Sequence, residues 1–188
     1  MTDRLGILIV EDEPLVAMGI SCCLEELHHE VLGTATTGLE ALQMAESCEP
    51  DLILMDINIP ELDGIIVMER LREKKNIPCI FLTGYSDSAL IERAAGVNAY
   101  GYLIKPVDVH DLEAAIGIAM RRFREMDDSR RALADRKLVE RAKGLLMDVL
   151  GMKEKQAMQF LQKRSRELNR KLPDLAKEII EKGIRLHE

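Results

Sequence analysis

The chain has 188 residues, of which 47% are apolar and 31% are charged, so it can bury a sizeable core and wholesale disorder is not expected. Only 3% are aromatic and there is no Trp, which argues against a protein that stacks single-stranded bases on aromatic rings. No apolar run approaches the ~20 residues of a membrane span, and the N-terminal run is too short for a signal peptide. We therefore expect a cytoplasmic protein without a membrane partner.

Charge is distributed unevenly along the chain. Residues 1–126 hold 10 Lys and Arg against 22 Asp and Glu, a net charge of −12. Residues 127–188 hold 16 against 11, a net charge of +5, which gives −7 for the whole chain. This asymmetry predicts two domains with different partners, of which the basic one would be repelled less by a polyanion such as nucleic acid.

The first part of the chain alternates short apolar runs with helical patterns. The apolar runs cover 5–10, 30–35, 51–56, 78–83 and 99–104. The amphipathic stretches cover 14–27, 38–47, 64–74, 86–95 and 108–126. This alternation predicts an α/β fold, a doubly wound five-stranded parallel sheet with helices on both faces.

No Gly-rich or Pro-rich linker follows the last of these helices. Apolar side chains instead recur at alternating spacings of four and three residues, at Leu112, Ile116, Ala119, Phe123 and Met126, with Leu133 in the same register. This spacing is typical of a coiled-coil seam, and it predicts a helix that continues into the second domain and pairs with a copy of itself. The alternative is a single helix that packs on its own sheet, and the polar Arg130, which interrupts the register, keeps this alternative open.

The tail shows three helical patterns, over about 130–149, 153–169 and 173–187. Gly151 is a stop signal for the first, and Pro173 fits the start of the third. Each pattern has one apolar face; the positions are 138, 142, 145, 146 and 149, then 157, 160, 161 and 168, then 175, 176, 179 and 180. We predict a small all-α domain of three helices over residues 125–188, after an α/β domain over residues 1–124.

Polar residues stand where the predicted strands end. The first run is followed by Glu11 and Asp12, the third ends in Asp56, the fourth in Thr83, and the fifth is followed by Lys105. These ends meet at one edge of a parallel sheet, where ligands bind. Three carboxylates there repel one another, and Mg²⁺, which prefers oxygen ligands, would relieve the repulsion. With a lysine and a hydroxyl nearby, the set suits phosphoryl transfer onto a carboxylate.

These residues lie in motifs that resemble the receiver domain of two-component response regulators. The motifs are ILIVEDE, LILMDINIPELDG, IFLTG and YGYLIKP, within residues 5–123. The resemblance implies a flavodoxin-like sheet with strand order 2-1-3-4-5 and a sensor histidine kinase as phosphodonor. Where the family often has two Asp, this chain has Glu11 and Asp12, which keeps both carboxylates.

By the same resemblance, Asp56 is the phosphoacceptor, Thr83 bonds the phosphoryl group and Lys105 pairs with it. Mg²⁺ is held by Glu11, Asp12, Asp56 and the backbone carbonyl of Asn58. Tyr102 is the aromatic switch that turns inward when Thr83 moves, and a plain buried aromatic is the alternative for it. The side chains of Asn58 and Tyr85 flank the site and are expected to tune the lifetime of the phosphate.

The tail resembles an ANTAR domain, the RNA-binding output of AmiR- and NasR-type antiterminators. The matching pieces are AKGLLM at 142–147, Gly151, the segment from Ala157 to Leu161, and NRKL at 169–172 with Ala176. The resemblance implies binding to RNA stem-loops in nascent transcripts, which lets transcription continue past a terminator.

The residues themselves agree in outline with an RNA-binding tail. Lys163, Arg166 and Arg170 are predicted on one helical face, where they could follow phosphates, with Lys171 at the turn. Asn169 could read a base edge in an open loop. Lys143 precedes Gly144, a helical glycine that suggests a close approach of a helix or of RNA. The alternative for each charge is an ordinary solvated face.

The combined prediction is a phosphorylation-controlled response regulator that forms a homodimer when phosphorylated and acts as an RNA-binding transcription antiterminator. It is not expected to be an enzyme, although it would slowly hydrolyse its own aspartyl phosphate. The alternatives are a DNA-binding regulator and a protein-binding relay. The kinase, its stimulus, the RNA targets, the phosphate lifetime and the role of Arg164 are not determined by these patterns.

Overall fold

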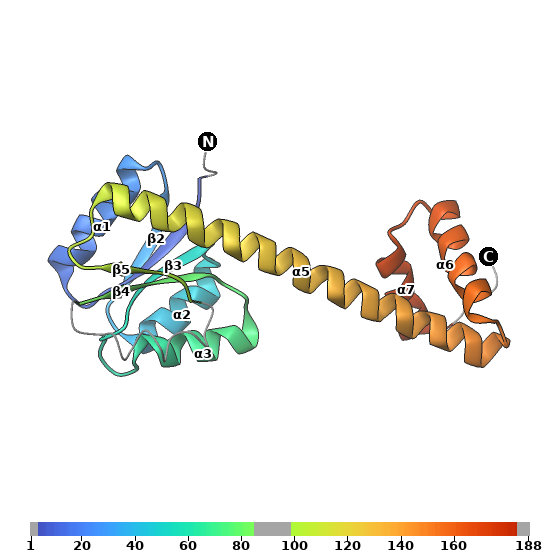
Figure 1. Ribbon diagram of the computed structural model, residues 1–188. Helices are drawn as coiled ribbons and strands as arrows, with labels where there is room; N and C mark the ends of the chain where they lie inside the picture. Colours follow the sequence, from blue (N-terminus) through green and yellow to red (C-terminus); the bar gives the residue numbers. More distant parts are fainter. Residues whose placement is uncertain (1–3, 85–98, 184–188) are drawn as a thin grey trace. The chain divides into compact units, whose positions relative to one another are not determined.

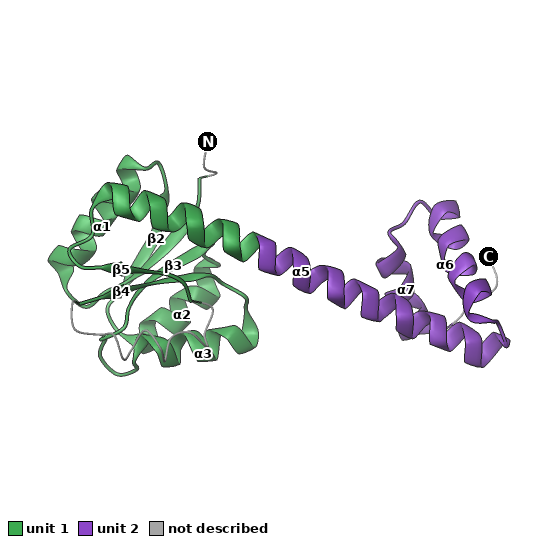
Figure 2. Ribbon diagram, in the orientation of Figure 1, with its two compact units in different colours: residues 1–124 green, residues 125–188 purple. Residues whose placement is uncertain are grey.

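The computed structural model describes residues 4–84 and 99–183. The chain forms two compact units, Met1–Arg124 and Glu125–Glu188 (Figure 2). The helix predicted over 86–95 lies outside the described residues. No helix within the described ranges is both long and apolar enough to cross a membrane.

Unit 1 contains a parallel sheet whose first four strands alternate with helices along the chain (Figure 1). The strands are β1 (Gly6–Val10), β2 (Glu30–Ala35), β3 (Leu52–Asp56), β4 (Cys79–Thr83) and β5 (Ala99–Ile104). Their order is β2-β1-β3-β4-β5, with every neighbouring pair parallel. The predicted flavodoxin-like sheet is confirmed. The central strands β3 and β4 are buried along their whole length, which explains their continuous apolar runs.

Helices cover both faces of this sheet. On one face, α2 (Gly38–Cys48) and α3 (Gly64–Lys74) bury residues such as Ala41, Ala45 and Met68 against Ile53 and Phe81. The other face is covered by α1 (Pro14–Glu26) and by the first part of α5 (Val109–Leu150). The candidate site lies at the carboxyl ends of the strands.

The first part of α5 packs on its own sheet, so the coiled-coil prediction is wrong for this segment. Leu112, Ile116 and Ala119 are fully buried in the core of unit 1. The ring of Phe123 meets that of Tyr100 edge-on, with centroids 5.5 Å apart. Spacings of four and three residues place side chains on one face of a helix. An apolar face of this kind can pack on a sheet as readily as on a second helix. Among the predicted seam residues, Met126 and Leu133 are exposed.

Unit 2 contains the rest of α5 together with α6 (Glu154–Glu167) and α7 (Leu172–Lys182). Its buried core combines the three helices; the residues are Val139, Ala142, Leu146, Ala157, Leu161, Leu175, Ala176 and Ile179. The predicted small helical domain is therefore present. Gly151, with φ of +64°, follows the end of α5 in the left-handed region that glycine favours.

Three details of the predicted helical faces need correction. Val149 is exposed, and Val139 and Leu150 contribute to the core instead. The second helix ends at Glu167 rather than 169, so Leu168 lies beyond it and is exposed. The third helix ends at Lys182, and residues 184–187 of its predicted range lie outside the described residues.

Candidate functional site

The predicted polar residues gather at the carboxyl edge of the sheet in unit 1. Glu11 directly follows β1, Asp56 ends β3, Thr83 ends β4 and Lys105 directly follows β5. Glu11, Asp56 and Thr83 are buried, while Asp12 is exposed at the rim. A parallel register brings these ends together, because Asp56 pairs with Leu82 and Thr83 with Ile104 in the ladders.

Lys105 links two of the three carboxylates. Its Nζ lies 2.6 Å from Asp56 Oδ2 and 2.6 Å from Glu11 Oε2, and only 18% of its side chain is exposed. The remaining oxygens accept backbone hydrogen bonds. The N–H of Asn58 donates to Asp56 Oδ1 at 3.0 Å, and the N–H of Glu13 donates to Glu11 Oε1 at 3.3 Å.

The charges in this cluster are coupled. Burial raises the pKa of Glu11, and the nearby charge of Asp56 raises it further, against the opposing effect of Lys105. Burial alone would lower the pKa of Lys105, but its hydrogen bonds to Asp56 and Glu11 outweigh burial, and its pKa lies above the ordinary value. Lys105 therefore stays protonated near neutral pH and serves as a fixed positive charge beside Asp56.

The carboxylates also fit a divalent cation. One carboxylate oxygen from each of Glu11, Asp12 and Asp56 lies within 4.8 Å of the others. Oε2 of Glu11 is buried and, among the described residues, contacts Lys105 but accepts no further hydrogen bond. A buried anionic oxygen with so few partners suits a hard cation such as Mg²⁺. The backbone carbonyl of Asn58 stays a predicted ligand. The contact of Asn58 with this cluster is made by its backbone N–H, which donates to Asp56 Oδ1.

Gly64 supports the site, and the sequence patterns did not single it out. It begins α3, and its N–H donates to the carbonyl of Ile57 at 3.0 Å. A Cβ at this position would collide with the carbonyl oxygen of Asp56 and crowd Met55. The glycine therefore lets α3 pack directly behind β3, the strand that ends in Asp56. Its place at the end of the LILMDINIPELDG motif was the available signal.

Thr83 and Tyr102 lie on the neighbouring strands β4 and β5. The carbonyl of Thr83 accepts a hydrogen bond from the N–H of Lys105 at 2.9 Å. The ring of Tyr102 stacks on Phe81, with centroids 6.1 Å apart and an interplanar angle of 20°. Tyr102 is half-buried, and burial raises its pKa. Its role as a switch stays a prediction, and Tyr85 lies outside the described residues.

Two of the basic residues predicted to contact RNA are tied to acidic side chains. Lys143 lies 2.7 Å from both Glu140 and Glu154, so it joins α5 to α6, and only 11% of its side chain is exposed. Arg170 pairs with Glu178 of α7. At Gly144 no described atom beyond the glycine's chain neighbours and the backbone of its own helix lies within 4 Å of where a Cβ would stand, so the close approach of another helix, one of the two predicted options, is absent there.

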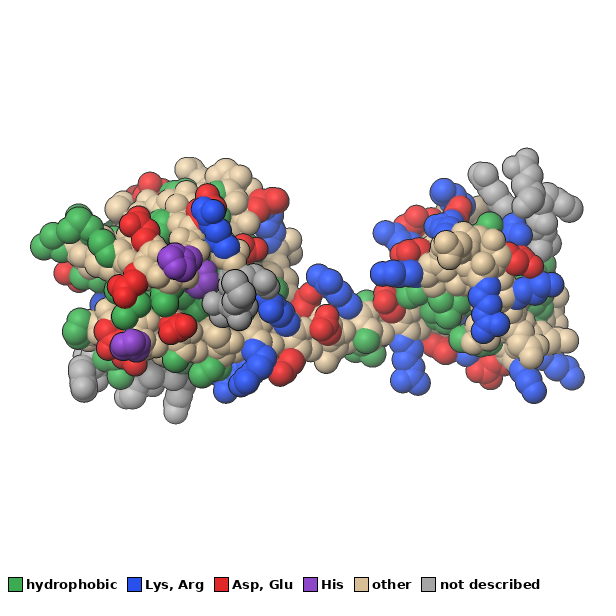
Figure 3. Space-filling model, turned by 90° about the horizontal axis from the view of Figure 1, so that it is seen from above, with side chains coloured by type: hydrophobic (Ala, Val, Ile, Leu, Met, Phe, Trp, Pro, Cys, Tyr) green, Lys and Arg blue, Asp and Glu red, His purple; other side chains and the backbone are tan. Residues whose placement is uncertain are grey.

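The prediction of one helical face for Lys163, Arg166 and Arg170 is wrong, because α6 ends at Glu167. Lys163 and Arg166 are exposed on α6, and Lys163 lies 3.8 Å from Glu167. Asn169 and Lys171 are exposed in the turn before α7; Asn169 has φ of +49°. Figure 3 shows Lys and Arg side chains spread over the surface of unit 2.

Known families match both units. The model of the response regulator receiver domain matches residues 7–117, and that of the ANTAR domain matches residues 127–180. The transcriptional regulatory protein PdtaR of Mycobacterium tuberculosis is 37% identical over 182 residues, which cover 93% of this chain and 89% of that protein. The positive alginate biosynthesis regulatory protein of Pseudomonas aeruginosa is 41% identical over 120 residues, which cover 62% of this chain and 48% of that protein.

Among solved structures, the signal receiver domain of a modulated diguanylate cyclase from Desulfovibrio desulfuricans G20 is similar to unit 1. It is 38% identical, with a TM-score of 0.62, and the match covers 66% of this chain and 99% of that one. The similarity to this structure and to the alginate regulator covers about two thirds of the chain, whereas the mycobacterial relative matches nearly all of it.

Proposed function

Because this chain belongs to the response regulators that join a receiver domain to an ANTAR domain, we propose that phosphorylation of Asp56 controls the binding of unit 2 to RNA stem-loops in nascent transcripts. In this role the protein is a transcription antiterminator of the cytoplasm, where such transcripts are made. The observation that carries the proposal is the buried cluster in which Lys105 contacts both Asp56 and Glu11.

Asp56 is the nucleophile of the proposed transfer. One of its carboxylate oxygens attacks the phosphorus of a phosphohistidine on a partner sensor kinase. The bond from phosphorus to the imidazole nitrogen breaks, and the electron pair returns to that nitrogen. Lys105 and the hydroxyl of Thr83 then hold oxygens of the new acyl phosphate, which keeps added negative charge stable at this buried edge.

Glu11, Asp12, Asp56 and the backbone carbonyl of Asn58 would hold Mg²⁺ in this proposal. The ion, when bound, neutralises charge on the transferring group. Lys105 and the metal ion would each neutralise part of the negative charge, because one ammonium cannot balance three carboxylates and a phosphoryl group.

The reaction is not turnover of an outside substrate. Water later attacks the phosphorus, the bond between phosphorus and the Asp56 oxygen breaks, inorganic phosphate leaves, and the free carboxylate returns. Asn58 is exposed, and its backbone N–H contacts the Asp56 carboxylate; with Tyr85, it is proposed to set how long the acyl phosphate lasts. The lifetime of the signal is then a property of the receiver itself.

Phosphorylation is proposed to act through Thr83 and Tyr102. A phosphoryl group on Asp56 attracts the Thr83 hydroxyl, and the space that Thr83 leaves is taken by the ring of Tyr102. Tyr102 already stacks on Phe81 within the core, so this shift repacks β4 against β5. A two-state rearrangement of this kind lets a local charge bias a distant surface.

The exposed part of α5 supports a homodimer in the phosphorylated state. Every residue from 124 to 137 except Asp127 is exposed. A helical segment that buries little of its surface is only marginally stable in water. Met126 and Leu133 lie one heptad apart, so a second copy would cover both. A dimer presents two basic domains to two RNA loops, and linked weak sites gain avidity.

The experiment that tests the proposal compares bound RNA with and without phosphorylation. The full chain is crosslinked to cellular RNA with Mg²⁺, in the presence and absence of acetyl phosphate, and the bound RNA is sequenced. We expect leader transcripts with paired hairpins to be enriched only with acetyl phosphate, and Asp56→Asn to abolish the enrichment. Equal recovery in all samples, or no RNA recovered from any sample, would contradict the proposal.

A further inference from the structure

We infer that the outward face of α6, formed by Lys155, Gln159, Gln162 and Arg166, is the surface on which unit 2 binds the sugar–phosphate backbone of RNA. The inference rests on the proposed function and names the side chains that serve it. Of the four, only Arg166 was singled out by the charge pattern of the sequence.

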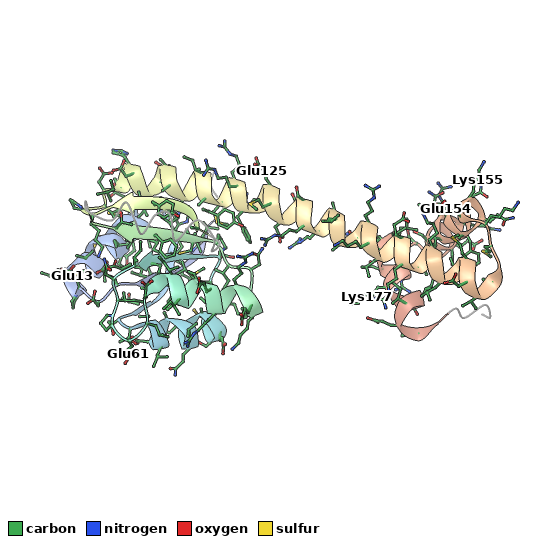
Figure 4. All side chains as sticks on the ribbon, turned by 60° about the horizontal axis from the view of Figure 1, so that its bottom comes forward. Glu13, Glu61, Glu125, Glu154, Lys155 and Lys177 are labelled. Atoms are coloured by element: carbon green, nitrogen blue, oxygen red, sulfur yellow. The ribbon has the colours of Figure 1, made fainter. Side chains whose placement is uncertain are left out.

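The four residues form one continuous line on the helix. They are spaced by four, three and four residues, which places them on the same face. All four are exposed, whereas Ala157 and Leu161 on the opposite face are fully buried in the core of unit 2. Figure 4 shows the Lys155 side chain extending away from its helix. The line rises about 16 Å along the axis, which is enough to follow several nucleotides.

These four side chains are available to bind a ligand, while the acidic side chains of α6 are paired with cations. Within residues 4–84 and 99–183, none of the four side chains has a hydrogen-bond or ion-pair partner. Both acidic residues of α6 contact cations: Glu154 pairs with Lys143, and Glu167 lies near Lys163 and Arg164. The outward line therefore presents two positive charges and two amides, and no carboxylate.

The chemistry of this line matches an RNA backbone better than a protein or DNA partner. Lys155 and Arg166 can each bind phosphate, Arg166 through a planar fork of N–H donors. Gln159 and Gln162 each offer a donor and an acceptor, which match the ribose 2′-hydroxyl that DNA lacks. Lys155 also lies in the first turn of α6, where the helix dipole disfavours a cation, and a bound phosphate would relieve that cost.

The test uses the full chain, phosphorylated with acetyl phosphate and Mg²⁺, and a fluorescent RNA library that carries two hairpins with randomised loops. The double variant Lys155→Gln/Arg166→Gln should bind at least tenfold more weakly. The slope of a plot of log affinity against log salt concentration should be shallower by about 1.5 in this variant. Each lost phosphate contact reduces the magnitude of this slope by roughly 0.7–0.9. Thermal melting of each variant checks that the exposed substitutions leave unit 2 folded.

The matched control is Lys177→Gln/Lys182→Gln, which also removes two exposed charges from unit 2. These cations pair with Glu181 and Glu178 on α7, so affinity and salt slope should stay close to wild type. Gln159→Ala/Gln162→Ala should reduce the preference for RNA over duplex DNA at an unchanged salt slope.

The outcomes separate the two claims. The assignment of this face is overturned if the wild-type protein binds the library and the Lys155/Arg166 variant binds it equally well. It is also overturned if the control variant loses as much affinity as the Lys155/Arg166 variant. Either result leaves the proposed function unaffected. Wild-type protein that does not bind the library overturns both.

Discussion

Replacing Lys105 with Met should destabilise unit 1, and the structure sets the size of the effect. At 2.6 Å and an effective dielectric constant of about 20, each ammonium–carboxylate contact contributes roughly 6 kcal/mol of attraction before desolvation. Breaking a buried pair costs about 3–5 kcal/mol in practice. Some of this is recovered, because 18% of the Lys105 side chain is exposed and water can reach the carboxylates. We expect a loss of about 2–3 kcal/mol at pH 8 without Mg²⁺.

The loss should depend on pH and on Mg²⁺. Without the ammonium the pKa of Glu11, already raised by burial, rises further. Between the unfolded pKa of about 4.5 and that raised value, the folded protein holds a proton that the unfolded chain releases. Stability of the variant therefore falls as pH rises, and its loss is smaller at pH 5.5 than at pH 8. Saturating Mg²⁺ should recover most of it, because the ion replaces the missing charge.

Urea denaturation of the wild type, Lys105→Met and Lys74→Met measures these effects. Lys74 pairs with Glu46 on the surface, where both side chains are exposed, so its loss should hardly change the midpoint. Equal losses in the two variants, or a Lys105→Met variant as stable as wild type in chelator at pH 8, would refute the idea that Lys105 holds the carboxylates together.

Three further predictions concern packing, pH and assembly. Gly64→Ala should lower the free energy of unfolding by about 2 kcal/mol, because the added Cβ collides with the carbonyl oxygen of Asp56. Gly19→Ala in α1 should raise the free energy of unfolding by up to about 1 kcal/mol, because the added Cβ would have no such neighbour within 4 Å. Urea denaturation that ranks the two variants the other way would contradict this prediction. Burial lowers the pKa of His29, so the unfolded chain binds more protons than the folded protein below pH 6.5, and stability falls on acidification. His29→Gln should remove this pH dependence, which amounts to at most about 1.4 kcal/mol per pH unit. Equal changes of unfolding free energy with pH in wild type and variant between pH 5.5 and 6.5 would count against it. Arg130→Leu fills the interruption of the exposed register and should raise the dimer fraction of unphosphorylated protein in sedimentation; an unchanged monomer would argue against a seam there.

The site in unit 1 was largely predictable from sequence. Each of its residues stands at the end of an apolar run, and parallel topology alone brings strand ends to one edge. The contact of Lys105 with both carboxylates needed the structure, since position after a strand does not specify where a long side chain points. The role of Gly64 depends on how closely α3 approaches β3, which no local pattern encodes.

Predictions failed where one pattern serves two kinds of packing. The spacing from Leu112 to Phe123 fits both a coiled coil and a helix on a sheet, and only the sheet beneath it decides the outcome. The predicted RNA face failed because α6 ends at Glu167, before Arg170. The ion pair of Lys143 with Glu154 joins α5 to α6, and that of Arg170 with Glu178 joins the turn before α7 to α7, so charge counting along the sequence could not find them.

The most direct test of phosphorylation control is the affinity of the full chain for the two-hairpin RNA library, measured with its oligomeric state, for wild type and Asp56→Asn. We predict that acetyl phosphate with Mg²⁺ shifts the wild type toward a dimer and tightens binding at least tenfold, and that Asp56→Asn shows neither change. Equal affinity of the two proteins with and without acetyl phosphate would contradict the claim that Asp56 governs RNA binding.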